Sequence, residues 1–313
     1  MRGSLLPSEA DLRLAGQSVY EHAIATPAVE VVVNETQALL KLECLQPTGS
    51  FKIRGASAAL AAAPDRAGPM VTISAGNMAR AAAYLASRVG REFIAFVPDH
   101  APAAKLDPIR RLGGEVRSLP FAEWWALARS MEPPLADSLF IHPFADRHVM
   151  AGNGTIGIEL ATLGEFDAVL VPWGGGGLAL GIAHALRSLR PEVEVYAVEV
   201  TTAAPLSASL AAGEPVTIDY VASFVDGIGS PEIIPAIWPL VSGLIAGVVT
   251  VTPEQAEDGV RFGAENAHVV VEGAGACAIA ALGDPRFAGK RVVAIVSGGN
   301  IDVAKAGQML ARV

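Results

Sequence analysis

One lysine stands in a stretch of chain that gives its charge little support. The stretch reads Gln46-Pro-Thr-Gly-Ser-Phe-Lys52-Ile-Arg-Gly55. Small, hydroxylated and aromatic neighbours predict a partly desolvated lysine, and desolvation lowers the pKa of an amine from about 10.4. The neutral amine of Lys52 could then act as a nucleophile and as a base. The alternative is a lysine whose stem lies on a helix while its ammonium stays in water.

A run of glycines offers a second kind of chemistry. The sequence Val169-Leu-Val-Pro-Trp-Gly-Gly-Gly-Gly177 predicts a buried strand and an open loop, followed by a helix from Leu178 to Arg187. Consecutive glycines leave their backbone N–H groups unobstructed, and the N-terminus of the next helix attracts negative charge. The run therefore predicts a phosphate site.

Two further elements place polar groups after a strand. Val71-Thr-Ile-Ser-Ala-Gly-Asn77-Met predicts a strand, a turn and a helix that opens near Met78, where a carboxylate or a cofactor hydroxyl would fit. Arg291-Val-Val-Ala-Ile-Val-Ser297-Gly-Gly-Asn300 predicts a strand that ends in a hydroxyl beside two glycines. The four elements together indicate a cleft built for a phosphorylated ligand.

In this order, the four elements resemble the fold-type II pyridoxal-phosphate enzymes, in the branch of threonine and serine dehydratases and serine racemases. The resemblance covers most of the chain. It implies an α/β fold like that of tryptophan synthase β, in which two parallel-sheet α/β domains hold the cofactor in the cleft between them. A small domain of residues 68–146 would be inserted into a large one formed by residues 1–67 and 147–313.

The resemblance also implies roles for the motif residues. Lys52 would hold pyridoxal 5'-phosphate as a Schiff base and, once displaced, would remove the α proton of the substrate. The implied cofactor-binding residues are Lys52, Phe51, Asn77, Gly174, Gly175, Gly176, Gly177, Leu178 and Ser297. The implied substrate-binding residues are Ser74, Ala75, Gly76, Asn77 and Met78.

The residue types favour one reaction within this branch. Ser297 would face the pyridine nitrogen with a hydroxyl in place of a carboxylate, which favours β elimination over transamination. Serine racemases carry a second serine as a base where this chain has Ala75. We therefore expect dehydration and deamination of L-threonine or L-serine to a 2-oxo acid and ammonia, with racemisation disfavoured.

The identity of the substrate side chain stays open. Met78 stands where these enzymes commonly have histidine. It could line a pocket for a bulkier or acidic substrate, such as phenylserine or 3-hydroxyaspartate, or it could only pack under the loop.

A divalent metal is not expected. Relatives bind one through a glutamate, a carbonyl and an aspartate, at the places of Glu199, Ala203 and Pro205 here. Proline has no ligating side chain, so Glu199 would bind a monovalent ion or cap the end of its strand.

Other polar residues receive structural interpretations. Asp226 matches a family loop near the active site and is expected to be structural. Glu272 could lie near the cofactor, or it could cap a helix, as glutamates at helix N-termini usually do. His100, His142 and His148 lack the spacing of a triad or a metal site. We expect them in solvent or satisfied in the core.

A nicotinamide-dependent oxidoreductase is the alternative from a different class. The strand at Val169, the glycine run, the helix and Glu199 imitate a dinucleotide-binding unit. However, the glycines are consecutive rather than spaced as Gly-x-Gly-x-x-Gly, and such an enzyme would not need the sequence around Lys52.

Composition agrees with a two-domain α/β enzyme. The 313 residues are 51% hydrophobic and carry a net charge of −9, which argues against a nucleic-acid partner. Cys44 and Cys277 cannot form a disulfide framework. Strand candidates such as Phe93 to Val97 alternate with alanine-rich helical patterns such as Met78 to Arg88.

Location and assembly are expectations of the same kind. The uncharged stretches 168–186 and 233–253 contain prolines, so a membrane span is not expected. The first residues lack a secretory pattern, which predicts a cytoplasmic protein. Only 13 residues follow Asn300, so no appended regulatory domain is expected. The resemblance implies a homodimer that acts on a small amino acid.

Overall fold

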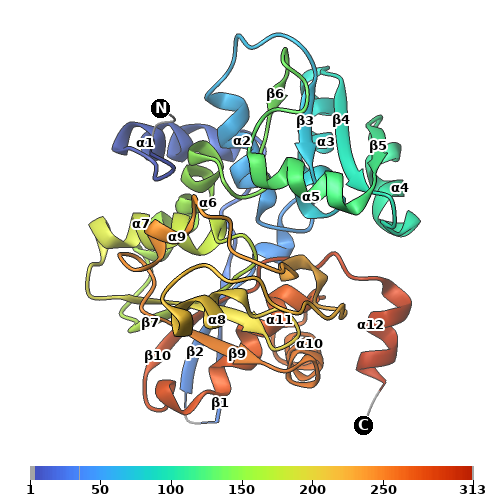
Figure 1. Ribbon diagram of the computed structural model, residues 1–313. Coiled ribbons are helices and arrows are strands. Elements are labelled where there is room, and N and C mark those ends of the chain that lie inside the picture. Colours follow the sequence, from blue (N-terminus) through green and yellow to red (C-terminus); the bar gives the residue numbers. More distant parts are fainter. Residues whose placement is uncertain (1–3, 35, 312–313) are drawn as a thin grey trace.

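Two sheets organise residues 4–34 and 36–311, which the computed structural model describes. The larger sheet has the strand order β1-β2-β10-β7-β8-β9 and the smaller one β5-β4-β3-β6. Figure 1 shows the sheets in two bodies, one above the other. The strands are β1 (Ala28–Val33), β2 (Thr36–Lys41), β3 (Met70–Ile73), β4 (Phe93–Pro98), β5 (Glu115–Leu119), β6 (Leu139–Phe140), β7 (Ala168–Pro172), β8 (Glu194–Val200), β9 (Gly247–Val251) and β10 (Arg291–Ile295).

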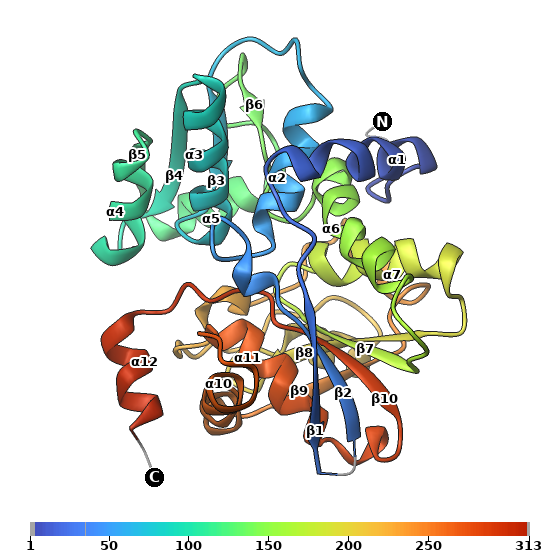
Figure 2. The ribbon, with the colours of Figure 1, turned by 180° about the vertical axis from the view of Figure 1, so that it is seen from behind.

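Helices connect the strands and cover the sheets, as α/β folds require. The α-helices are α1 (Glu9–Ser18), α2 (Lys52–Ala61), α3 (Asn77–Val89), α4 (Ala103–Arg111), α5 (Phe121–Ser130), α6 (Arg147–Leu160), α7 (Gly177–Leu189), α8 (Pro205–Ala212), α9 (Trp238–Val241), α10 (Pro253–Ala267), α11 (Gly273–Ala280) and α12 (Val303–Leu310). Short 3-10 helices include η1 (Val19–Glu21), η2 (Glu43–Leu45) and η3 (Asp226–Ile228). Figure 2 shows α1 on the upper body and α12 beside the lower one.

Several elements begin where the sequence predicts. Thr252 caps α10 and forms a capping box with Gln255, and Pro253 occupies the first turn, where its missing N–H costs nothing. The helix predicted from Met78 to Arg88 lies inside α3, which ends at Gly90 in the left-handed conformation. The antiparallel hairpin of β1 and β2 was not predicted. It adds an antiparallel edge to an otherwise parallel sheet.

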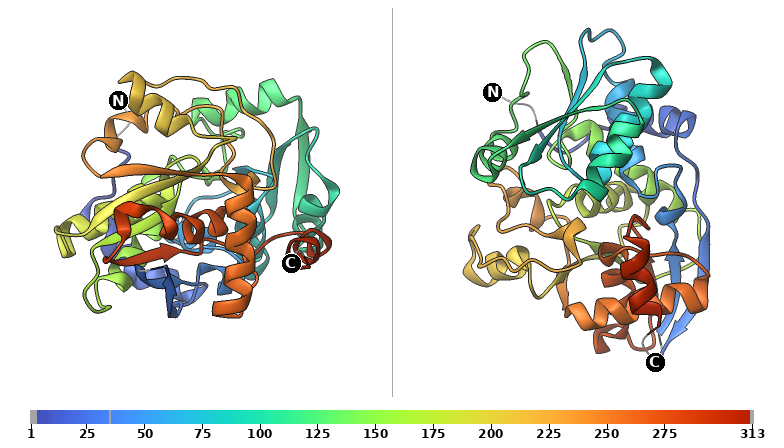
Figure 3. Two further views of the ribbon diagram at one scale, coloured as in Figure 1. Left: turned by 90° about the horizontal axis from the view of Figure 1, so that it is seen from below. Right: turned by 90° about the vertical axis from the view of Figure 1, so that its right-hand side faces the viewer.

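The two sheets draw on different parts of the chain. The strands of the smaller sheet lie between Met70 and Phe140, and those of the larger sheet come from both ends of the chain. The division into residues 68–146 and the rest of the chain stays a prediction. Helix α2 also contributes to the core beside the smaller sheet, where Ile53 packs in one cluster with Met70 and Ala79. The views of Figure 3 show both bodies from two further sides.

The parallel order brings distant motifs to one edge. Strand β10 pairs in parallel with β7, with Ala294 opposite Leu170. The residues that follow these strands, Ser297 and the glycine run, therefore leave the sheet at the same edge, where ligands bind in open α/β sheets.

Within the described residues, no helix is both long and apolar enough to cross a membrane.

Candidate active site

Lys52 begins α2 and reaches a backbone carbonyl of another element. Its Nζ atom donates a hydrogen bond of 2.6 Å to the carbonyl oxygen of Pro143 and lies 4.9 Å from the centre of the Phe51 ring. Burial lowers the pKa of Lys52 to about 8, and the Glu272 carboxylate opposes that shift. The amine is therefore poorly hydrated, although Lys52 as a whole is only partly buried.

The chain just before Lys52 lies against the chain around Ser297. Ser50 forms an antiparallel bridge with Gly298, and the Phe51 N–H donates to the Ser297 carbonyl oxygen at 3.0 Å. The Ser297 side chain is buried, and its hydroxyl has no hydrogen-bond partner among the described residues. Two motifs from opposite ends of the chain are therefore adjacent, and an unpaired hydroxyl lies between them.

The glycine run packs so closely that side chains would not fit. A Cβ atom at Gly175 would lie 2.2 Å from Cγ of Phe144, and one at Gly177 would lie 2.5 Å from the Phe144 carbonyl oxygen. At Gly176, φ is +84°, a conformation that glycine adopts without strain. Helix α7 then starts at Gly177, followed by the buried Leu178. The predicted loop and helix N-terminus are both present.

Asn77 is held by residues from the other body. Its Nδ2 atom donates to Oε1 of Glu272 at 2.7 Å, and its Oδ1 atom accepts from Nδ2 of Asn300 at 2.8 Å. Asn300 Oδ1 in turn accepts from Arg80 Nη1 at 2.6 Å. This polar cluster joins α3, beside the smaller sheet, to residues 272 and 300, which lie beside α11 and after β10 of the larger sheet.

Glu272 requires a correction to the sequence interpretation. Its backbone stands at the N-cap of α11, but its side chain makes no capping hydrogen bond. The carboxylate contacts Asn77 instead, and a Cβ atom at Gly298 would lie 2.4 Å from its Oε1 atom. Burial raises the pKa of Glu272 to about 7, against the lowering effect of the Asn77 hydrogen bond. A carboxylate before a Gly-Ala-Gly helix start was the available signal.

The turn before α3 has the form that its sequence predicts. Ser74 Oγ accepts from the Gly76 N–H at 3.2 Å, and Ala75 packs against the core of the smaller sheet. Met78 is 1% exposed in that same core. Of the two interpretations of Met78, packing under the loop describes its side chain, so the residue does not face an open pocket.

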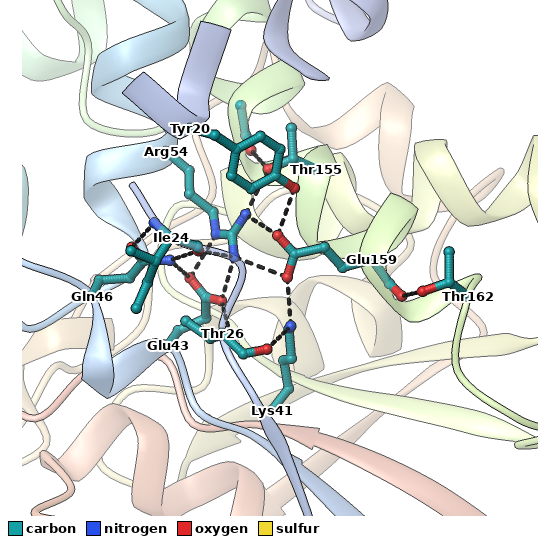
Figure 4. A network of polar contacts seen from close by, with 11 residues as sticks. Tyr20, Ile24, Thr26, Lys41, Glu43, Gln46, Arg54, Thr155, Glu159 and Thr162 are labelled. Atoms are coloured by element: carbon teal, nitrogen blue, oxygen red, sulfur yellow. Dashed lines mark hydrogen bonds and ion pairs between the residues drawn. The ribbon is translucent and has the colours of Figure 1, made fainter. Parts of the chain in front are cut away.

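The first motif also supplies a buried charge network, which the sequence analysis missed. Figure 4 shows Arg54 between Glu43 and Glu159, with Lys41 and Tyr20 on the same carboxylate of Glu159. Arg54 Nε and Nη2 donate to Glu43 at 2.7 and 2.8 Å, and Nη1 donates to Glu159 at 2.7 Å. Opposite charges satisfy each other here, as buried ions require. Arg54 thereby ties α2, which starts at Lys52, to η2 and α6.

Glu199 caps a helix rather than its own strand, which corrects the sequence interpretation. Its Oε1 and Oε2 atoms accept from the Leu206 and Ser207 N–H groups at 2.8 and 2.9 Å, at the start of α8. Burial raises the pKa of Glu199 to about 7, against these two hydrogen bonds. Both carboxylate oxygens therefore have donors already.

The remaining predicted residues lie at the margins or in the core. Asp226 Oδ2 accepts from Lys105 Nζ at 2.7 Å, a contact between η3 and α4. His100 is exposed, and His148 lies 3.4 Å from an Asp11 oxygen. His142 is buried and hydrogen-bonded. In the described parts of the chain, no cluster of metal-ligating side chains is found, and Cys44 and Cys277 are free.

The fold and site define a class: a two-sheet α/β enzyme in which an amine-bearing lysine and a glycine loop both contact the segment 143–144. The family described as pyridoxal-phosphate dependent enzyme matches residues 20–298. The L-threonine ammonia-lyase of Thermotoga maritima is 37% identical over 291 residues, which cover 91% of this chain and 72% of that protein.

Solved structures agree. The serine racemase of Dictyostelium discoideum superposes with a TM-score of 0.85 at 28% identity and covers 96% of this chain and 100% of its own. A threonine deaminase from T.th. superposes with a TM-score of 0.82 at 30% identity, over 95% of this chain and 99% of its own. The chain belongs to the pyridoxal-phosphate-dependent enzymes of fold type II. The nicotinamide alternative is therefore wrong.

The residues present fit the family's cofactor. The unpaired, buried hydroxyl of Ser297 can serve a ring nitrogen, and the glycine run, with no side chains of its own, precedes the N-terminus of α7, which attracts anions. The amine of Lys52 is placed where an aldehyde could react with it.

Proposed function

We propose that this enzyme eliminates water from a β-hydroxy-α-amino acid, such as L-threonine or L-serine. The enamine that is released then takes up water and hydrolyses to a 2-oxo acid and ammonia. The observation that carries the proposal is the position of Lys52: its amine is bonded to the Pro143 carbonyl, and the preceding residue, Phe51, is hydrogen-bonded to the backbone of Ser297. The relatives named threonine ammonia-lyase and threonine deaminase support it.

The cofactor contacts form part of the proposal. Lys52 would bind pyridoxal 5'-phosphate covalently, and Ser297 would face its ring nitrogen. Asn77 has a second Nδ2 hydrogen for the ring hydroxyl while the first bonds to Glu272. Phe51 would pack beside the ring. The phosphate would lie on the backbone N–H groups of Gly174, Gly175, Gly176, Gly177 and Leu178.

When bound, the cofactor supplies an electron sink for negative charge at the substrate Cα. Lys52 then removes the α proton at its Nζ atom. Burial lowers the pKa of this amine to about 8, which favours its neutral, basic form, and the carbonyl oxygen of Pro143 accepts one of its N–H groups and so positions the nitrogen. A hydroxyl at Ser297, rather than a carboxylate, leaves the ring nitrogen unprotonated and favours loss of the β substituent.

Binding of the substrate carboxylate is assigned to the turn before α3. The backbone N–H groups of Ser74, Ala75 and Gly76 lie at the start of α3, whose N-terminus attracts anions. The Gly76 N–H would exchange the Ser74 hydroxyl for the substrate carboxylate. Asn77 and Met78 follow these groups. The apolar Ala75 offers no second base there, which favours elimination over racemisation.

The experiment follows the visible spectrum of the purified protein during addition of L-threonine, L-serine, L-threo-phenylserine and 3-hydroxyaspartate in turn. We expect a band that changes on addition, with 2-oxo acid and ammonia formed in equal amounts. The preferred substrate decides between threonine or serine and the bulkier or acidic alternatives. A protein that binds the cofactor but releases no ammonia from any of them would refute the proposal.

We further propose a cytoplasmic homodimer. Two free cysteines suit a reducing compartment. Leu45 and Val270 are exposed apolar residues near each other, since a Cβ atom at Gly299 would touch both Cys44 and the Val270 carbonyl oxygen. A second copy could cover this patch, and sedimentation of Val270→Glu against the wild type would test it.

A further inference from the structure

A buried histidine joins α5 to the segment between β6 and α6. His142 follows β6 and is 2% exposed. Its Nε2 atom lies 3.0 Å from the carbonyl oxygen of Ala128 in α5, and its Nδ1 atom lies 2.8 Å from the N–H of Ala145 and 3.3 Å from that of Phe144. A carbonyl only accepts and an N–H only donates. These partners therefore require a neutral ring with its proton on Nε2 and an acceptor at Nδ1.

The segment 142–145 that this ring holds contacts both halves of the proposed site. The carbonyl oxygen of Pro143 accepts from Lys52 Nζ at 2.6 Å. Phe144 covers the glycine run, where it occupies the space that a side chain at Gly175 would need. The His142 ring meets the Phe144 ring edge-on, with centres 4.7 Å apart. One imidazole thus supports the carbonyl that orients the amine and the ring that shapes the phosphate loop.

We propose that His142 is a positioning residue for Lys52 and the phosphate loop, acting through the acceptor at its Nδ1 atom. This inference rests on the proposed role of Lys52. Pro143 has no N–H, and the hydrogen bonds of the Phe144 and Ala145 N–H groups end on the imidazole. Without the acceptor, these N–H groups would be left unpaired in the interior, a costly state that the segment would relieve by shifting. A shift of the segment would move the Pro143 carbonyl away from the amine.

Two substitutions test the contributions of the two ring nitrogens separately. In His142→Asn, the amide oxygen can take the place of Nδ1 and keep the acceptor, while the bond to Ala128 is lost. In His142→Gln, the amide nitrogen can take the place of Nε2 and keep that bond, while the acceptor is lost. The measurements are the pyridoxal phosphate dissociation constant of each apoprotein, the position of the visible band of the lysine-bound cofactor, and the thermal unfolding temperature.

We expect His142→Gln to weaken cofactor binding about tenfold or more and to shift the visible band, and His142→Asn to stay within about threefold of the wild type. Equal losses in both variants, or losses that only follow the unfolding temperatures, would assign His142 a general packing role and overturn the inference. No loss in His142→Gln would overturn it as well.

A measurement on the wild-type protein tests the inference even if the variants fail to fold. Nitrogen-15 NMR of histidine-labelled protein distinguishes the tautomers, and we expect His142 to carry its proton on Nε2 with and without cofactor. A proton on Nδ1 would refute the acceptor role. The NMR measurement does not depend on turnover. A proton on Nδ1 would therefore refute the role of His142 without affecting the proposed elimination. Absence of ammonia in the substrate assay would refute the elimination without affecting the tautomer.

Discussion

The side-chain amide of Asn77 donates a 2.7 Å hydrogen bond to Oε1 of Glu272, which joins the first residue of α3 to the residue before α11. Asn300 donates to the other end of the same amide at 2.8 Å. These two bonds fix which atom of Asn77 faces which neighbour. The free Nδ2 hydrogen therefore has a defined direction, as the proposed contact with the cofactor requires.

Replacement of Glu272 tests this arrangement. Glu272→Gln keeps an acceptor oxygen for Asn77 and is expected to retain kcat/KM within about threefold. Glu272→Ala removes it, and loss of a hydrogen bond to a carboxylate, worth about 1.5–3 kcal/mol, should lower kcat/KM about 10- to 100-fold. Steady-state kinetics of both variants provide the check. Equal activity of the two would contradict a role for the acceptor.

The titration of Lys52 gives a pH dependence with a definite sign. Burial lowers the pKa of Lys52 to about 8, and the neutral amine is the reactive form. Labelling of Lys52 in the apoprotein with trinitrobenzenesulfonate, followed by peptide mass analysis, should accelerate as the pH rises through about 8. The same peptide in concentrated urea is the control, with a midpoint near 10.5. Coincident midpoints would exclude a desolvated amine.

The glycine run should be intolerant of a single methyl group. In Gly175→Ala, the new Cβ atom would overlap the Phe144 ring, so the loop must shift and pyridoxal phosphate should bind at least about tenfold more weakly. Gly164→Ala is the matched control, because nothing lies within 4 Å of a Cβ atom there. Titration of each apoprotein with the cofactor measures the difference. Indistinguishable dissociation constants would refute the proposal that the glycine run binds the cofactor phosphate.

The charge network of Figure 4 predicts a large loss of stability. Arg54→Met leaves the carboxylates of Glu43 and Glu159 without their shared guanidinium, which should cost about 3–5 kcal/mol in the free energy of unfolding. Urea unfolding measures this quantity. Arg117→Ala is the control, because Arg117 pairs with Glu115 on the surface and should unfold like the wild type. Equal stability of the two variants would show that the network contributes little.

The hydrogen bonds of Glu199 lead us to expect an activity that does not depend on a divalent cation. Both carboxylate oxygens accept backbone N–H groups of α8, and Pro205 supplies no ligand at the helix start. Dialysis against a chelator should change kcat less than about twofold, with or without added Mg²⁺. A loss that Mg²⁺ restores would contradict this assignment of the carboxylate.

Much of the fold could be predicted because its signals are local. The glycine run and the Ser-Ala-Gly-Asn turn each combine a strand end, a loop and a helix start within ten residues, and they led to the family that the comparisons confirm. The hairpin of β1 and β2 was missed because Asn34-Glu35, between the two strands, is not the Asn-Gly or Asp-Gly pair typical of hairpins, and β1 lacks a strict alternation of buried and exposed residues. The roles assigned to single residues remain proposals.

The sequence by itself determined which chemical groups the chain carries: an amine at Lys52, unobstructed N–H groups from Gly174 to Gly177 and a hydroxyl at Ser297. Only the tertiary structure decided their partners. The Glu272 carboxylate contacts Asn77 and does not cap its own helix. Glu199 caps α8. The His142 ring accepts from the Ala145 N–H, two residues after the carbonyl that contacts Lys52. Such hydrogen bonds join residues far apart in the chain, and burial decides which of them form, because an interior polar group must find a partner.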